Sequence, residues 1–374
     1  MIMKKIMCAL LILALLLPPF ALAEGEFGAL FAGGSETMSP SLARFALDIS
    51  SRHTAELTAK AFEENGIEVL LQRYYDKPHD ETSHTAAFTV GKAAASVGGA
   101  SREICVIAIR GTNGAEWYSN FDFAPSQSDE TIFAENFLFA AQDIFLSVNA
   151  EIKKMDNPII LVCGHSRGAA CANLLGVLLN AVYPFENVFV YTFATPATVR
   201  GDFDADKYKN IFNFINPLDL VPRLPLAEWG YKRAGIDFVL SGDAEAAERL
   251  RASVSSLYTL APTISEYYNS RHSLTAAGLS DDGLTAFEMM LLISDMLTSV
   301  TIGENESVAD FSMFSVADSM SVSDMADESS DFHTLLTLLE SLTENGGEIG
   351  SRVTNAHMPD TYMELLGELS GAAK

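Results

Sequence analysis

The pentapeptide Gly164-His165-Ser166-Arg167-Gly168 fits the pattern G-x-S-x-G and constrains this chain more than any other segment. An apolar run, 158–163, precedes it, and an alanine- and leucine-rich stretch, 169–182, follows it. This order predicts a buried strand, a tight turn and a helix. Glycines are needed beside the serine because it would occupy a strained turn in which neighbouring side chains collide. We therefore predict that Ser166 is a nucleophile, with the helix start directing backbone N–H groups at developing negative charge.

Strand-like and helical segments alternate on both sides of this turn. Continuous apolar runs are typical of strands that are buried in a parallel sheet, and near-helical spacing of apolar residues marks the segments between them. The expected helices are 37–64 and 131–154. The expected strands are two alternating, β-rich runs, 67–75 and 85–97, and the apolar runs 104–109, 158–163, 188–193 and 211–215. Such alternation predicts a central, mostly parallel sheet covered by helices on both faces. With the strand–turn–helix around Ser166, the expected architecture is the α/β-hydrolase fold.

The first residues have the pattern of a secretory signal peptide. Lys4 and Lys5 precede the apolar stretch 6–17, and Ala21-Leu22-Ala23 is an A-x-A cleavage pattern ahead of Glu24. Residues 1–23 are therefore predicted to be removed, which places the mature protein outside the cytoplasm. The alternative is an uncleaved N-terminal anchor, and release from the cell envelope is left open.

The mature chain, 24–374, is long enough for one large domain. Composition changes at about residue 240: residues 243–300 favour helix, and 302–331 are rich in Ser, Asp, Glu and Met. We expect 240–331 to be an insertion in a single α/β-hydrolase domain, either a cap or a partly disordered loop.

The charge and the cysteine content of the chain argue against several classes of function. The net charge of −25 argues against nucleic-acid binding and against electrostatic attraction to anionic membranes. Cys105, Cys163 and Cys171, which remain after cleavage, lie in apolar segments and are predicted to be buried free thiols. No Cys/His spacing typical of a metal site occurs, and we expect neither a metal nor another cofactor.

A nucleophilic serine needs a base, and in this fold the chain order is serine, acid, histidine. His272, His333 and His357 follow Ser166 at a distance, and the first two lie in or near the insertion. His357 precedes the expected last helix, 360–369, and a loop there can reach back over the serine. We predict His357 as the base, and we expect the side chain of His165 to point away from Ser166 into the scaffold.

Asp219 is the predicted acid, because it directly follows the turn that leaves the strand 211–215. Asp202, Asp204 and Asp206 are alternatives in a polar connection before that strand.

The oxyanion hole requires two N–H donors. One is expected from Arg167, the residue after the nucleophile, and the other from Thr112, which follows the strand 104–109 after Arg110 and Gly111.

Together these segments resemble the class 3 (fungal-type) triacylglycerol lipases, especially their bacterial exported branch. The resemblance covers about residues 85–235 and, more thinly, the C-terminal end. The residues that carry it are 109–112, Trp117, Asn120, 164–170, 191–196, 213–223, His357 and Tyr362.

The resemblance implies the same assignments: Ser166 as nucleophile, Asp219 as acid, His357 as base, and Thr112 with Arg167 as oxyanion hole. It implies cleavage of lipid or acylglycerol esters and leaves open whether the ester substrate is bound at a lipid interface.

Several alternatives stay open at this point. The activity could be that of a feruloyl or other carboxylesterase, a phospholipase A1 or an acyltransferase, and a non-catalytic binding scaffold is a further reading. Either 121–132 or 243–331 could act as a lid, and the stretch between Asp219 and His357 is longer than a lipase core needs. Acyl chain length, interfacial activation and oligomeric state do not follow from the sequence.

Overall fold

The computed structural model describes residues 26–75, 85–111, 133–219, 221–223, 231–242 and 356–371. Several predictions fall outside these residues and are not described by the structure. They concern the expected signal peptide, the candidate lid 121–132, the expected insertion beyond residue 242 with its candidate lid, and the residues Thr112, His272 and His333. Within the described ranges, no helix combines the length and the apolar character needed to cross a bilayer.

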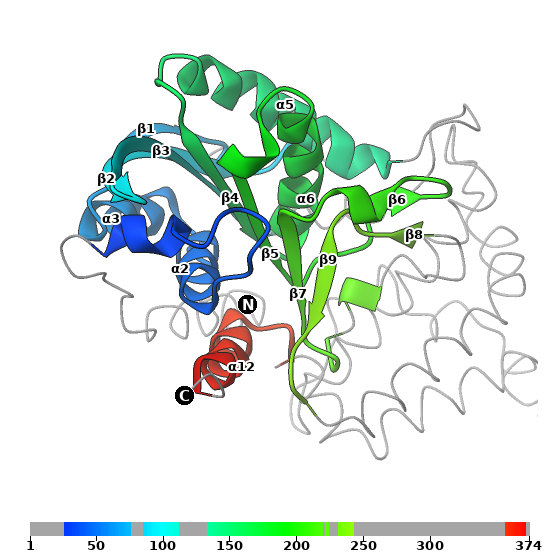
Figure 1. Cartoon of the computed structure of the whole chain (residues 1–374). Coiled ribbons are helices and arrows are strands. Elements are labelled where there is room, and N and C mark those ends of the chain that lie inside the picture. Colours follow the sequence, from blue (N-terminus) through cyan, green and yellow to red (C-terminus); the bar gives the residue numbers. More distant parts are fainter. Residues whose placement is uncertain are drawn as a thin grey trace, which may run out of the picture.

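In the described part of the chain, a seven-stranded sheet lies between two layers of helices (Figure 1). Its strands, in spatial order, are β1 (Glu68–Arg73), β2 (Phe88–Val97), β3 (Ala100–Ile109), β4 (Ile159–His165), β5 (Val188–Phe193), β7 (Ile211–Ile215) and β9 (Ile236–Val239). The strands from β3 to β9 pair in parallel, and β1, β2 and β3 pair antiparallel. The expected mostly parallel sheet of an α/β-hydrolase fold is therefore confirmed.

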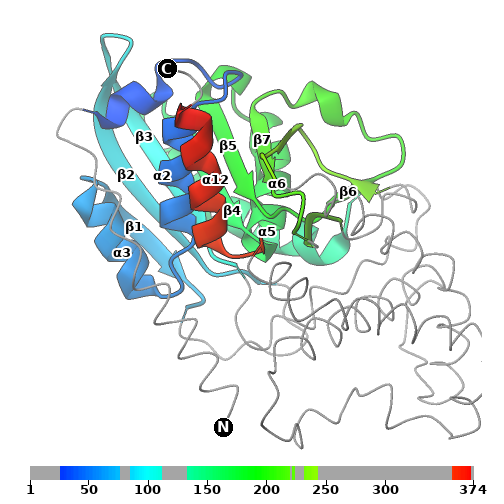
Figure 2. The ribbon, with the colours of Figure 1, turned by 90° about the horizontal axis from the view of Figure 1, so that it is seen from below.

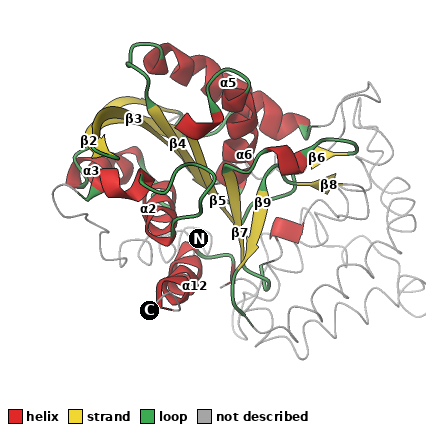
Figure 3. Ribbon diagram, in the orientation of Figure 1, coloured by secondary structure: helices red, strands yellow, loops and turns green. Residues whose placement is uncertain are grey.

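Helices cover both faces of the sheet (Figures 1 and 3). The helices α5 (Glu135–Ile152) and α6 (Arg167–Asn180) lie on one face. On the other face lie α2 (Pro40–Ser50), α3 (Ala55–Glu64) and α12 (Pro359–Gly371), with α2 and α12 side by side (Figure 2). The shorter elements are the 3₁₀ helices η1 (Phe27–Phe31), η2 (Phe185–Asn187), η3 (Ala205–Lys207) and η4 (Val221–Arg223), and the paired strands β6 (Val199–Arg200) and β8 (Tyr231–Lys232).

Each face of the sheet has its own hydrophobic core, because successive side chains of a strand point to opposite faces. Ile107 and Val162 belong to the core under α5 and α6, whereas their neighbours Val106 and Leu161 belong to the core under α2 and α12. Continuous apolar runs are needed because every central strand is buried on both faces. Cys105, Cys163 and Cys171 are buried and form no disulfide bond within the described part of the chain, as predicted.

One predicted helix was wrong. Residues 37–64 form two helices and not one, because Thr54 has extended backbone angles and its side chain accepts a hydrogen bond from Leu57 N at 3.2 Å. A threonine in this role starts a new helix. The last helix, Pro359–Gly371, confirms the helix expected over about 360–369, and proline suits its first position.

Candidate active site

Ser166 sits on a strained turn between β4 and α6. Its φ of 57° and ψ of −127° lie outside the regions that L-residues prefer. A Cβ atom on Gly164 would lie 2.2 Å from the carbonyl oxygen of Gly168, and one on Gly168 would lie 2.4 Å from that of Ile109. The predicted strand–turn–helix is therefore confirmed, together with the steric reason for both glycines.

His357 lies between Ser166 and Asp219. Its Nε2 is 3.0 Å from Ser166 Oγ, and its Nδ1 is 2.9 Å and 3.1 Å from the two carboxylate oxygens of Asp219. With the proton on Nδ1, the imidazole donates to Asp219 and accepts from the serine hydroxyl. The structure thus brings these three predicted residues together, although 138 residues separate Asp219 from His357.

Asp219 is held by a set of donors around its carboxylate. The side chain is buried, with 1% exposure. Tyr362 donates its hydroxyl to Oδ2 at 2.8 Å, and the N–H of Val221 donates to Oδ1 at 3.0 Å. Burial raises the pKa of Tyr362 well above its usual range, and the charge of Asp219 raises it further, so the phenol remains protonated and donates. Hydrogen bonds from Tyr362, Val221 and His357 thus compensate the buried carboxylate.

The segment that carries His357 is tied to the strand ends beneath it. Asn216 donates its side-chain N–H to the carbonyl oxygen of Ala356 at 2.9 Å, and its backbone N–H to the hydroxyl of Tyr362 at 3.1 Å. His165 Nε2 lies 3.0 Å from the carbonyl oxygen of His357. The base is therefore fixed from both sides of its own backbone.

His165 occupies a position that sequence reasoning described incompletely. Its side chain is buried in the scaffold, as predicted, but its ring also lies 5.0 Å from the ring of His357, centroid to centroid. Burial lowers the pKa of His165 well below its ordinary value, and the nearby His357 lowers it further. The neutral ring then donates from Nε2 to the carbonyl of His357. No local signal pointed to this contact, because the partner is 192 residues away.

This contact predicts different effects of two substitutions at His165. His165→Leu removes the donor and is expected to lower kcat by about 10- to 100-fold, as for other residues that orient a functional side chain. His165→Gln should retain most of the activity, because an amide N–H can reach the position of Nε2. Steady-state ester hydrolysis measures both, and equal losses in the two variants would contradict the role of the hydrogen bond.

Stability against acid provides a second readout at the same residue. The folded pKa of His165 lies below its unfolded value of about 6.5, so the unfolded chain binds a proton that the folded chain does not. The free energy of unfolding should therefore decrease as the pH falls below that value. His165→Gln removes this titration, and its thermal unfolding should depend less on pH in this range.

The predicted oxyanion hole lies partly within the described residues. Arg167 is the first residue of α6, and its side chain donates to the carbonyl oxygen of Thr85 at 3.3 Å. Gly111 lies next to the nucleophile, since a Cβ atom on it would be 3.5 Å from Ser166 Cβ. Thr112 follows Gly111 directly but lies outside the described residues.

The alternative acids are placed away from this cluster. Asp202, Asp204 and Asp206 are exposed around η3, and the hydrogen bonds of His357 described above go to Asp219. Among the described residues, no three His, Cys, Asp or Glu side chains converge to hold a metal ion.

The molecule has the α/β-hydrolase fold, with a serine at the tight turn between β4 and α6. Residues 106–229 match the sequence model of the class 3 lipase family. This segment contains Ser166 and Asp219 and ends before His357. The chain is accordingly a serine ester hydrolase.

Solved structures of fungal lipases are similar to this chain. A fungal lipase–inhibitor complex is 19% identical, with 55% of this chain and 82% of that chain covered and a TM-score of 0.44. The Rhizomucor miehei lipase propeptide complex is 18% identical, with 55% and 70% covered and a TM-score of 0.42. The mono- and diacylglycerol lipase of Aspergillus oryzae is 18% identical, with 55% and 81% covered and a TM-score of 0.40.

Proposed function

We propose that this protein is an exported lipase that cleaves carboxylic esters of lipids or acylglycerols through a Ser166–Asp219–His357 triad. The observation that carries the proposal is the continuous hydrogen-bond chain from Ser166 Oγ through His357 to the buried Asp219. Export rests on the N-terminal pattern of residues 1–23, and N-terminal sequencing of protein recovered outside the cytoplasm tests the cleavage before Glu24.

In the proposed reaction, Ser166 Oγ attacks the ester carbonyl carbon while His357 Nε2 takes its proton. Asp219 holds the imidazole and stabilises the imidazolium that forms. The backbone N–H groups of Arg167 and Thr112 donate to the tetrahedral oxyanion. The alcohol leaves with the proton from His357, and an acyl-serine remains.

Water completes the cycle. His357 removes a proton from the water as it attacks the acyl-serine, and then returns the proton to Ser166 Oγ as the carboxylic acid leaves. Ser166 is half-buried and the His357 side chain is 25% exposed, so both can be reached by a substrate, whereas Asp219 is shielded. The negative net charge favours departure of the carboxylate product.

The experiment is hydrolysis of p-nitrophenyl esters from acetate to palmitate by residues 24–374, together with labelling by a fluorophosphonate. We expect labelling and hydrolysis, with the highest kcat/KM on the longer chains. A profile confined to acetate and butyrate would indicate a carboxylesterase. If the protein neither reacts with the fluorophosphonate nor hydrolyses any ester, we would reject the enzymatic function and infer a binding scaffold.

A further inference from the structure

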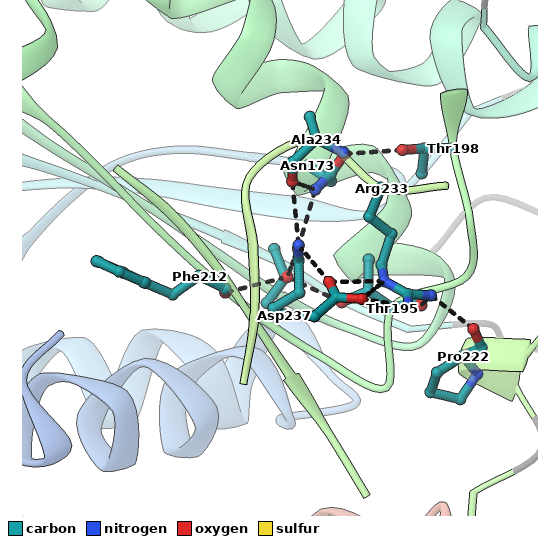
Figure 4. Close-up of polar contacts among 10 residues, drawn as sticks. Asn173, Thr195, Thr198, Phe212, Pro222, Arg233, Ala234 and Asp237 are labelled. Carbon is teal, nitrogen blue, oxygen red and sulfur yellow. Dashed lines mark hydrogen bonds and ion pairs between the residues drawn. The ribbon is translucent and has the colours of Figure 1, made fainter. Parts of the chain in front are cut away.

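The guanidinium group of Arg233 joins two loops that follow the carboxyl ends of β5 and β7. Arg233 lies in the turn between β8 and β9, and its Nη1 donates to the carbonyl oxygen of Pro222 at 2.5 Å and to that of Thr195 at 3.1 Å (Figure 4). Thr195 lies in the loop that follows β5, and Pro222 lies in η4, three residues after Asp219. One side chain thus binds the backbone of both loops.

The direction of this guanidinium is set by Asp237 on β9. Nε of Arg233 donates to Oδ1 at 3.0 Å and Nη2 donates to Oδ2 at 2.5 Å, which is a bidentate arrangement. The Arg233 side chain is 13% exposed and that of Asp237 is 40% exposed. Because Nε and Nη2 are engaged by the carboxylate, Nη1 is directed at the two carbonyl groups.

The turn that carries Arg233 is itself fixed to the core. The carbonyl oxygen of Ala234 accepts from two buried asparagines. Asn173 on α6 donates to it at 2.8 Å (Figure 4). Asn213 on β7 donates to it at 3.0 Å. Asn213 also donates to Asp237 Oδ1 at 3.0 Å. These bonds fix the backbone next to Arg233 relative to α6, the helix that starts immediately after Ser166.

The loop that Arg233 holds also carries a hydrogen-bond donor to the carboxylate of Asp219. Val221, the residue before Pro222, donates its backbone N–H to Asp219 Oδ1. A shift of the Pro222 carbonyl would move this N–H and so rotate or release the carboxylate. Tyr362, another donor to Asp219, has a pKa that burial raises well above its usual range, and the charge of nearby Arg233 offsets part of that increase.

We propose that Arg233, oriented by Asp237, is a positioning residue for the catalytic acid: it holds the Asp219–Arg223 loop against the loop after β5 in the geometry that His357 requires. This inference rests on the function proposed above. Errors of about 1 Å in a catalytic group cost roughly 100-fold in rate, so a positioning residue acts on kcat.

The test compares the same substitution at two arginines whose side chains bind loops at opposite ends of the parallel strands. Arg233→Lys keeps the charge, but an ammonium lacks the planar fork needed to bind Asp237 and two carbonyls together. The matched control is Arg102→Lys, because Arg102 also donates to a backbone carbonyl, that of Asn157, but near the amino end of β4. We expect kcat to fall by about 10- to 100-fold in Arg233→Lys, with KM changed less than about threefold, as for other supporting residues of a site. Arg102→Lys should retain wild-type kcat.

Asp237→Asn provides a second variant if Arg233→Lys does not fold. It keeps the size of the side chain but weakens the bidentate pair, and a smaller loss of kcat with an unchanged KM is expected. Wild-type kcat in a folded Arg233 or Asp237 variant, or a change in KM alone, would overturn the proposal.

Amide hydrogen exchange at Val221 separates this inference from the proposed function. If Arg233 holds the loop, Val221 N–H should exchange faster in Arg233→Lys than in wild type and Arg102→Lys, even if the wild type hydrolyses no ester. Unchanged protection of Val221 would overturn the positioning role. Failure of the wild type to react with fluorophosphonate would overturn the proposed function alone.

Discussion

Replacing His357 with alanine is expected to lower kcat by roughly five to six orders of magnitude, close to the effect of Ser166→Ala, because each removes one partner of the same proton transfer. His357 Nε2 lies 3.0 Å from Ser166 Oγ, so its loss leaves the hydroxyl without the base that takes its proton. For the same reason the double variant should be no slower than either single variant. Hydrolysis of a p-nitrophenyl ester under single-turnover conditions measures these losses directly.

His272→Ala and His333→Ala serve as matched controls, because both histidines follow Ser166 in the chain as His357 does. We expect kcat in both to equal that of the wild type. If His357→Ala remained active while one of these variants lost activity, that histidine would be the base, and the catalytic roles proposed here would have to change. Thermal unfolding of each variant verifies that a loss reflects chemistry and not folding.

Asp219→Asn is expected to lower kcat by about four orders of magnitude, although the substitution changes almost no volume. The carboxylate of Asp219 accepts from His357 Nδ1, the Tyr362 hydroxyl and the Val221 N–H. An amide offers one acceptor oxygen and an NH₂ group, so one of these donors would face another donor. If the NH₂ group faces His357, the imidazole must place its proton on Nε2, where it cannot accept from Ser166.

Tyr362→Phe tests whether the tautomer argument is specific to the His357 contact. It removes one donor to Asp219 and leaves the carboxylate, so we expect a loss of only about tenfold, typical of an outer partner of a functional side chain. A loss in Asp219→Asn no larger than in Tyr362→Phe would contradict the role of Asp219, and the exposed Asp202, Asp204 and Asp206 would then be tested in turn.

Part of the architecture could be predicted because its causes are local. The strand before Ser166 and the helix after it follow from the apolar runs on either side, and the glycines follow from steric needs within one turn. The parallel arrangement of β3, β4, β5 and β7 follows from the alternation of buried strands with helices. The single helix expected over 37–64 was wrong because the capping geometry of Thr54 outweighs apolar spacing that continues across it.

The site is different, because its partners are distant in sequence. Chain order narrowed the base to three histidines, but the bond from His165 to the backbone of His357 spans 192 residues and that from Asn216 to Ala356 spans 140. No periodicity or spacing encodes such contacts. The same holds for Arg233, whose neighbours in sequence gave no indication that it binds Pro222 and Thr195.

Turn sterics and burial act over a few residues, so the turn at Ser166, the sheet covered on both faces and a short set of candidate side chains could be predicted from the sequence. The place of His357 before the last helix already favoured it as the base, but the contacts that fix His357 and Asp219 are visible only in the folded molecule. Those contacts depend on how the α2–α12 face and the β8–β9 turn pack onto the strand ends, where buried polar groups must find partners far along the chain.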